Sequence, residues 1–214
     1  MAFDVERYLN VRSASGGAFG PDGERIAFTM FVEASAPSFA ELPSPPDGAD
    51  WADRPDVTTQ TIYRRDGGGY TKRGHAQLFT VPASGGTPRQ LTSAPYDHGG
   101  VPVWTPDGET LLLSANRHED AALAPLNTEI YAVDVSSGSV SALTTREGPD
   151  GDVAVSPDGS TLAYTGFDDR EQGYQVTKLY LMDRDGTNAR VLTEDFGHDV
   201  QNPTFTAGGE RIVF

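Results

Sequence analysis

The stretch Ala154-Val-Ser-Pro-Asp-Gly-Ser-Thr-Leu-Ala-Tyr164 decides the fold, because the chain repeats it. Apolar residues flank a central Pro-Asp-Gly, and the same arrangement occurs at residues 18–28 and 103–113. A degenerate fourth copy, in which Ala207 stands in the place of the proline, occupies residues 204–214. The steps from the second copy to the third and from the third to the fourth are 51 and 50 residues. A fixed period of this length is the signature of a repeat architecture.

Each Pro-Asp-Gly predicts a tight turn between two antiparallel strands. Proline fixes φ near the value that the first central position of a turn requires, and aspartate can accept a hydrogen bond from the nearby backbone. Glycine adopts positive φ without steric cost. The apolar runs on both sides then supply two strands that pair as a hairpin.

A second pattern recurs in phase with the first, and it predicts a second hairpin in every repeat. An apolar run leads through a glycine-containing turn to a Leu-Thr pair. The three copies join residues 78–81 to Leu91-Thr92, residues 130–133 to Leu143-Thr144, and residues 179–182 to Leu192-Thr193.

Two hairpins make four strands in about 50 residues, which is one blade of a β-propeller. The strands are apolar at successive positions, as a sheet covered on both faces requires. We therefore predict an all-β fold, a partial and open β-propeller of about three and a half four-stranded blades. The predicted blades cover 18–92, 101–144 and 153–193, followed by a half blade at 203–214. Because blades bury their faces against neighbours, the chain is expected to come from something longer.

The first repeat carries about 35 additional residues, which we place in an insertion at 32–76. Residues 3–9 are predicted to form one helical turn before the first blade. Within the insertion, Arg64, Arg65 and Asp66 are the candidate site for binding a substrate or partner, because paired arginines suit a carboxylate. The alternative is a solvated strand end that pairs with nearby aspartates.

Composition excludes several functional classes. The net charge is −15, with 31 acidic and 16 basic residues, so the surface repels nucleic acid and anionic membranes. Lysine is scarce and aspartate abundant, which favours a halophilic source in which salt screens the charge, although an ordinary acidic bacterial protein is the alternative. Absence of cysteine, of a secretory signal and of a long apolar stretch predicts a cytoplasmic location.

The sequence offers no complete catalytic or metal site. No Gly-x-Ser-x-Gly elbow occurs, so we assign no catalytic residue and expect the chain alone to be inactive. The four histidines lack the spacing of metal ligands, and we expect neither a metal nor another cofactor. Gly67-Gly68-Gly69 lacks the lysine and helix of a phosphate loop, and it is expected to form the tip of the insertion.

The repeated Pro-Asp-Gly and Leu-Thr signature, together with Ile62-Tyr-Arg-Arg-Asp-Gly-Gly-Gly-Tyr70 and Gly85-Gly-Thr-Pro-Arg-Gln-Leu-Thr92, resembles a known family. It is similar to the N-terminal propeller of prolyl-oligopeptidase-family serine peptidases, in the acylaminoacyl-peptidase and dipeptidyl-aminopeptidase branch. The resemblance implies a propeller, usually of seven blades, that gates short peptides before an α/β-hydrolase domain. None of the family's catalytic positions falls within this sequence.

This resemblance implies a peptide substrate, reached through a hydrolase domain that the chain does not contain. Two alternatives remain open. A free-standing Tol-type propeller would act as a protein-binding scaffold, with a homo-oligomer or a protein partner covering the open blade edge. A propeller enzyme with its site in the central channel would need paired carboxylates near the axis.

Overall fold

A computed structural model describes residues 14–35, 46–50 and 57–214. The predicted helical turn at 3–9 and parts of the predicted insertion lie outside these residues. The described chain forms two compact units, one from residues 14–32 and 75–214 and a smaller one within residues 33–74. The described residues contain strands and turns but no helix.

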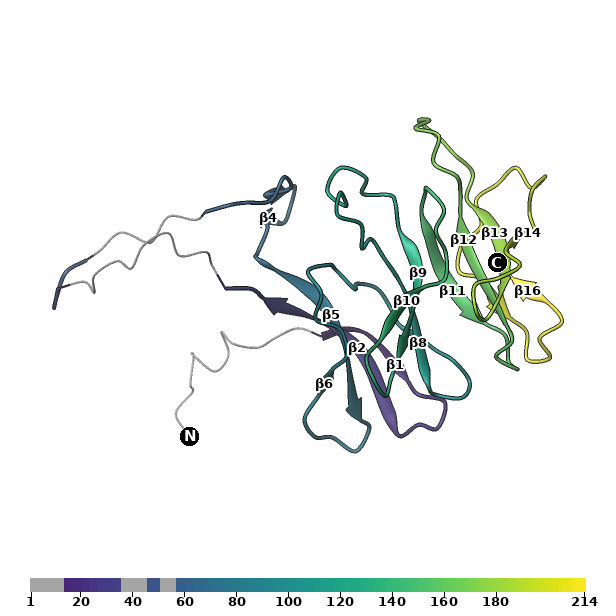
Figure 1. The fold of residues 1–214 in the computed structure, drawn as a ribbon, viewed down its shortest axis with the longest axis horizontal. Coiled ribbons are helices and arrows are strands. Elements are labelled where there is room, and N and C mark those ends of the chain that lie inside the picture. Colours follow the sequence, from purple (N-terminus) through teal and green to yellow (C-terminus); the bar gives the residue numbers. More distant parts are fainter. Residues whose placement is uncertain (1–13, 36–45, 51–56) are drawn as a thin grey trace. The chain divides into compact units, whose positions relative to one another are not determined.

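The larger unit holds three four-stranded antiparallel sheets and one two-stranded sheet (Figure 1). The first sheet contains β1 (Ala14–Phe19), β2 (Arg25–Glu33), β5 (Gly74–Pro82) and β6 (Arg89–Gln90). The second contains β7 (Val103–Trp104), β8 (Thr110–Ala115), β9 (Glu129–Asp134) and β10 (Val140–Ala142). The third contains β11 (Asp150–Val155), β12 (Thr161–Gly166), β13 (Lys178–Asp183) and β14 (Arg190–Val191), and the short sheet pairs β15 (Thr204–Phe205) with β16 (Ile212–Val213).

The strands follow one another in order across every sheet, and the first strands of successive sheets contact each other. Thus β1, β7, β11 and β15 form the inner edge, while β6, β10 and β14 lie on the outer side. This arrangement confirms the predicted all-β, open propeller. The blade limits that we derived from the repeats stay a prediction.

The apolar cores lie between successive sheets. Leu111 and Leu113 pack toward the first sheet, whereas Leu112 between them packs with the third sheet. All three side chains are fully buried. Burial on both faces confirms the interpretation of the successive apolar positions, and each such leucine stabilises the fold by roughly 1.5–3 kcal/mol.

The Pro-Asp-Gly turns stack on one another from sheet to sheet. A Cβ placed on Gly108 would lie 3.4 Å from the Pro21 ring, at ordinary packing distance. The glycine of each later turn meets the proline of the turn before it in the same way, in the pairs Gly108 on Pro21, Gly159 on Pro106 and Gly209 on Pro157. The repeated tripeptide is therefore a contact between sheets as well as a turn within one.

The Leu-Thr pairs also serve a neighbouring sheet. A Cβ on Gly138 would lie 2.7 Å from the carbonyl oxygen of Leu91, and one on Gly186 would lie 2.5 Å from that of Leu143. Only glycine permits an approach this close. Gly85, the corresponding turn residue of the first sheet, has nothing within 4 Å. The leucine carbonyl of one sheet thus lies against the outer-turn glycine of the next sheet. We call this contact a seat.

The threonine of each pair holds its own sheet together. Its hydroxyl accepts a hydrogen bond from the backbone N–H of a buried leucine or isoleucine of the third strand, at 2.8–2.9 Å in all three sheets. The pairs are Leu78 N to Thr92, Ile130 N to Thr144 and Leu179 N to Thr193. This bond satisfies a buried backbone N–H that would otherwise be costly.

The two ends of the larger unit differ in their loops. Short turns connect the first two and the last two strands of each sheet, and these turns carry the stacked glycines. The opposite end carries the long loops, residues 116–128 and 167–177, together with the segments that lead into the next sheet. Long loops held by a rigid scaffold are where binding residues concentrate.

Candidate functional site

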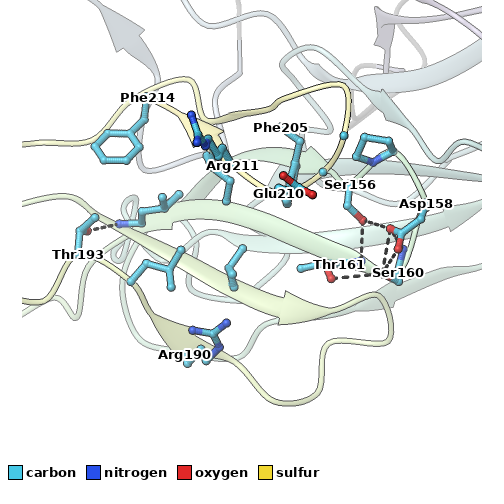
Figure 2. Close-up of a pocket in the computed structure, with 17 residues that line it drawn as sticks. Ser156, Asp158, Ser160, Thr161, Arg190, Thr193, Phe205, Glu210, Arg211 and Phe214 are labelled. Atoms are coloured by element: carbon cyan, nitrogen blue, oxygen red, sulfur yellow. Dashed lines mark hydrogen bonds between the residues drawn. The ribbon is translucent and has the colours of Figure 1, made fainter.

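A groove of about 760 Å³ lies beside β15 and β16 (Figure 2). Its floor is apolar, with Leu179, Leu181 and Ile212, while Arg190 and Glu210 supply charged groups. Leu192 lines this groove and is 42% exposed, whereas Leu91 in the first sheet is 8% exposed. No described residue covers Leu192 as Gly138 covers Leu91. The groove therefore has the form of a seat for another turn.

The Asp158 carboxylate beside this groove is committed to its own turn. It accepts hydrogen bonds from the Ser156 hydroxyl at 2.6 Å and from the Ser160 backbone and hydroxyl. These bonds lower the pKa of Asp158. Figure 2 shows the group gathered on the turn. A carboxylate stabilised in its charged form in this way is a poor general acid or base at neutral pH.

A buried ionic cluster joins the second and third sheets at the long-loop end. Asp150 is fully buried and forms an ion pair with Arg146. Burial raises the pKa of Asp150, and the Arg146 charge opposes that change. Arg146 in turn lies 4.2 Å from the centroid of Tyr180, which stacks on Tyr164 at 5.2 Å. The cluster packs the junction between the second and third sheets, and its side chains also line a groove of about 440 Å³.

Glu129 is the second buried carboxylate at this end. It accepts a hydrogen bond from Thr144 at 2.6 Å, and His118 Nε2 lies 3.6 Å from its other oxygen. Burial raises the pKa of Glu129. Gln77 holds the same place in the first sheet and accepts from Thr92 at 2.7 Å. A neutral amide therefore makes the same hydrogen bond at this position of the sheet. The role of Glu129 is to orient the threonine hydroxyl rather than to transfer protons.

His98 is buried at the junction of the first two sheets. Its Nε2 lies 3.2 Å from Arg117, whose guanidinium also contacts the rings of Tyr96 and Tyr131. Burial, with the Arg117 charge, lowers the pKa of His98 to about 4. The imidazole is therefore neutral at physiological pH and has a structural role.

The predicted binding residues lie on a short hairpin of the smaller unit. Arg64 and Arg65 form β3 (Arg64–Arg65), which pairs with β4 (Gly69–Tyr70), and Asp66 begins the turn. All three side chains are exposed. They do not line the groove of about 480 Å³ in the same unit. Sequence reasoning missed the residues that do, chiefly Tyr63, Tyr70, Lys72 and Arg73.

Comparison with known proteins assigns this chain to a family. The sequence pattern of the dipeptidyl peptidase IV (DPP IV) N-terminal region matches residues 47–168, more than half of the chain. The chain belongs to this family. This match confirms the resemblance that we drew from the repeat signature and the Tyr-Arg-Arg-Asp-Gly insertion.

Two relatives and one solved structure illustrate the range of this likeness. The peptidase YuxL of Bacillus subtilis (strain 168) is 32% identical over 142 residues, covering 50% of this chain and 21% of YuxL. The Tol-Pal system protein TolB of Anaeromyxobacter dehalogenans (strain 2CP-C) is 33% identical over 133 residues, covering 62% of this chain and 27% of TolB. The crystal structure of TolB from Acinetobacter baumannii has a TM-score of 0.57 at 21% identity, covering 94% of this chain and 37% of that one.

These comparisons set the scale of what the chain represents. It spans less than half of the length of the curated relatives it matches. The likeness to the solved TolB shows the fold alone. Within residues 14–35, 46–50 and 57–214, no group of three His, Asp or Glu side chains could hold a metal ion. In the same residues no helix is long and apolar enough to cross a bilayer.

Proposed function

We propose that this DPP IV N-terminal family chain is the non-catalytic propeller portion of a serine-type oligopeptidase of the acylaminoacyl-peptidase kind. Its role is to gate the access of short peptides to a hydrolase domain. The observation that carries the proposal is the family match over residues 47–168, supported by the identity to YuxL. The composition supports a place in the cytoplasm of a salt-adapted cell.

The contacts between sheets suit a gate. A filter that excludes folded proteins by size needs walls that do not spread, and proteins resist deformation where packing is dense. The stacked Pro-Gly turns join successive sheets at all three junctions, and the Leu-Gly seats add a second contact at the first two. Arg89 adds hydrogen bonds from the first sheet to the carbonyl oxygens of Val135 and Ser136, at 2.9 and 2.5 Å.

The test begins with the source gene and its complete product. We expect a frame that includes a Gly-x-Ser-x-Gly hydrolase, and a product that cleaves short peptides but not unfolded protein chains. A purified 1–214 chain should cleave neither. Hydrolysis by the 1–214 chain that is blocked by a serine reagent, or equal cleavage of short peptides and long chains by the complete product, would refute the gating role.

A Tol-type binding scaffold is the second candidate, favoured by the 33% identity to TolB and by the groove beside Leu192. In that case a protein partner or a second copy would occupy the open blade edge. Light scattering of the 1–214 chain and of Leu192→Asp separates the two forms of this idea. A dimer that the substitution dissociates supports self-association, and a monomer that captures a partner only with Leu192 intact supports a scaffold.

A further inference from the structure

The ten residues from Arg64 to Arg73 have a charge opposite to that of the whole chain. They hold Arg64, Arg65, Lys72 and Arg73 but only one acidic residue, Asp66, in a protein of net charge −15. An anion is repelled by most of this surface and attracted here. The charge reversal marks the hairpin as a place for a negatively charged ligand.

The hairpin and the strand ends beside it form a concave site. Thr71 N donates to the carbonyl oxygen of Tyr63 at 2.8 Å, which extends the pairing beyond β3 and β4. Ala34 N donates to the carbonyl oxygen of Arg73 at 3.1 Å and brings the start of the unit alongside. The resulting groove of about 480 Å³ is within the size range of small-ligand sites.

Two tyrosines give the groove an apolar surface. Tyr63 and Tyr70 line it and are 51% and 72% exposed. Their ring centroids are 6.5 Å apart. Aromatic side chains combine large contact area with little conformational entropy to lose, so an exposed pair suits the binding of an apolar side chain.

The cations of this unit are available to a ligand. In the larger unit some basic groups are paired, as Lys178 with Glu194 at 2.8 Å and Arg184 with Asp107 at 2.6 Å. No described acidic group lies within 4 Å of the charged nitrogens of Arg64, Arg65, Lys72 or Arg73. Lys72 and Arg73 line the groove together with a single described acidic residue, Glu33.

We infer that this groove binds the carboxylate of a short peptide, with Lys72 and Arg73 as its ligands and Tyr63 and Tyr70 against the neighbouring side chain. Arg64 and Arg65 attract the peptide from the tip of the hairpin. The inference rests on the proposed function, since it names the peptides that such a gate would admit. Charge-assisted hydrogen bonds of this kind change affinity by roughly tenfold to a hundredfold.

The test measures fluorescence anisotropy of fluorescein-labelled Gly-Ala-Phe-Ala with the intact 1–214 chain, at low and at molar salt. We expect the free acid to bind at least tenfold more tightly than its C-terminal amide, and the difference to shrink in molar salt. A third peptide, Gly-Ala-Phe-Asp amide, identifies the source of the carboxylate. Tight binding shows that a side-chain carboxylate suffices, and weak binding shows that the site selects the C-terminus.

Substitutions assign the binding to the groove. The double variant Lys72→Gln and Arg73→Gln should weaken binding of the free acid at least tenfold, whereas Lys72→Arg with Arg73→Lys should keep it within threefold. Arg170→Gln with Arg184→Gln removes the same charge from the larger unit and should change binding less than twofold. Far-UV circular dichroism checks that every variant is folded.

Equal affinity for acid and amide, or an unchanged affinity in the Lys72 and Arg73 double variant, would overturn the inference. Gating is measured separately, by the size of substrate that the complete product cleaves. The two results are independent. The carboxylate-binding inference can be refuted while the gating proposal holds, and gating can be refuted while the 1–214 chain still binds carboxylates.

Discussion

The guanidinium carbon of Arg146 lies 4.2 Å from the ring centroid of Tyr180. Tyr131 holds the same place in the preceding repeat as Tyr180, and there the ring is contacted at 5.2 Å by Arg117. The two arginines come from different segments, one after a Leu-Thr pair and the other after β8. The position above the tyrosine is thus retained, although the chain reaches it by two routes.

Replacing Arg146 with methionine should lower the free energy of unfolding by about 3–5 kcal/mol, because it leaves the buried Asp150 carboxylate without its partner. Equilibrium unfolding in urea measures the loss. Arg190→Met removes an exposed arginine and should cost under about 1 kcal/mol. Adding Asp150→Asn to Arg146→Met should restore part of the stability, and a double variant as unstable as the sum of both single changes would argue against the ion pair.

Glycine-to-alanine changes at Gly186 and Gly85 separate backbone strain from contact between sheets. Both residues have positive φ, 86° and 94°, so each alanine incurs a backbone cost of about 1–2 kcal/mol. At Gly186 the new Cβ would also lie 2.5 Å from the Leu143 carbonyl oxygen, which adds about 1–3 kcal/mol. Thermal unfolding should therefore show a lower midpoint for Gly186→Ala, and equal midpoints would contradict the seat described here.

His98 should make the chain acid-sensitive. Its pKa is about 4 in the folded state and about 6.5 in the unfolded chain, so the unfolded state binds a proton first as the pH falls. Stability is fully present above pH 6.5 and declines toward pH 4, by a total on the order of 3 kcal/mol. Urea unfolding at several pH values should give a shallower decline for His98→Gln than for the unchanged chain. Parallel declines would show that the imidazole does not contribute.

Glu129→Gln should stabilise the chain at neutral pH. Burial raises the pKa of Glu129, so the charged side chain costs stability once the pH exceeds the unfolded value of about 4.3. Gln77 shows that an amide fits this position and accepts the threonine bond. We expect a gain of about 1 kcal/mol at pH 7 that vanishes near pH 4. A loss at pH 7 would mean that the contact with His118 outweighs the cost of burial.

Salt should stabilise the whole chain. A net charge of −15 favours expansion through self-repulsion, and molar salt shortens the screening length to about 3 Å. We expect the urea midpoint to rise steadily as sodium chloride increases from millimolar to molar concentrations. Complete folding at low salt by far-UV circular dichroism, with no further gain on adding salt, would remove the support for a salt-adapted source.

The sheets could be predicted from the sequence because the repeated Pro-Asp-Gly residues make a contact at every junction between sheets. Pro106 and Leu143 recur in phase with other copies since each contacts a glycine of the following sheet, and such contacts leave a regular spacing in the chain. Arg117 and Arg146 could not be recognised as equivalent, because they occupy different positions in the repeat and converge only in space.

The sequence predicted only part of the candidate site, because most of its residues also come together only in space. Arg64 and Arg65 stand out as adjacent cations, whereas the groove combines Glu33 and residues 57–60 with residues 70–73, which the fold brings together. The available signal was Lys72, because it lies in the same basic segment and lysine is otherwise nearly absent from the chain.

The stacked turns also bear on how such a chain can lengthen. The two inner copies, at 106–108 and 157–159, carry both halves of the contact, a proline that supports the next glycine and a glycine that rests on the previous proline. A gene segment of about 50 residues, duplicated in frame, would therefore bring a matching contact to each of its borders without compensating substitutions. Blade number can then change in evolution by a single event, while the junctions between blades remain the same.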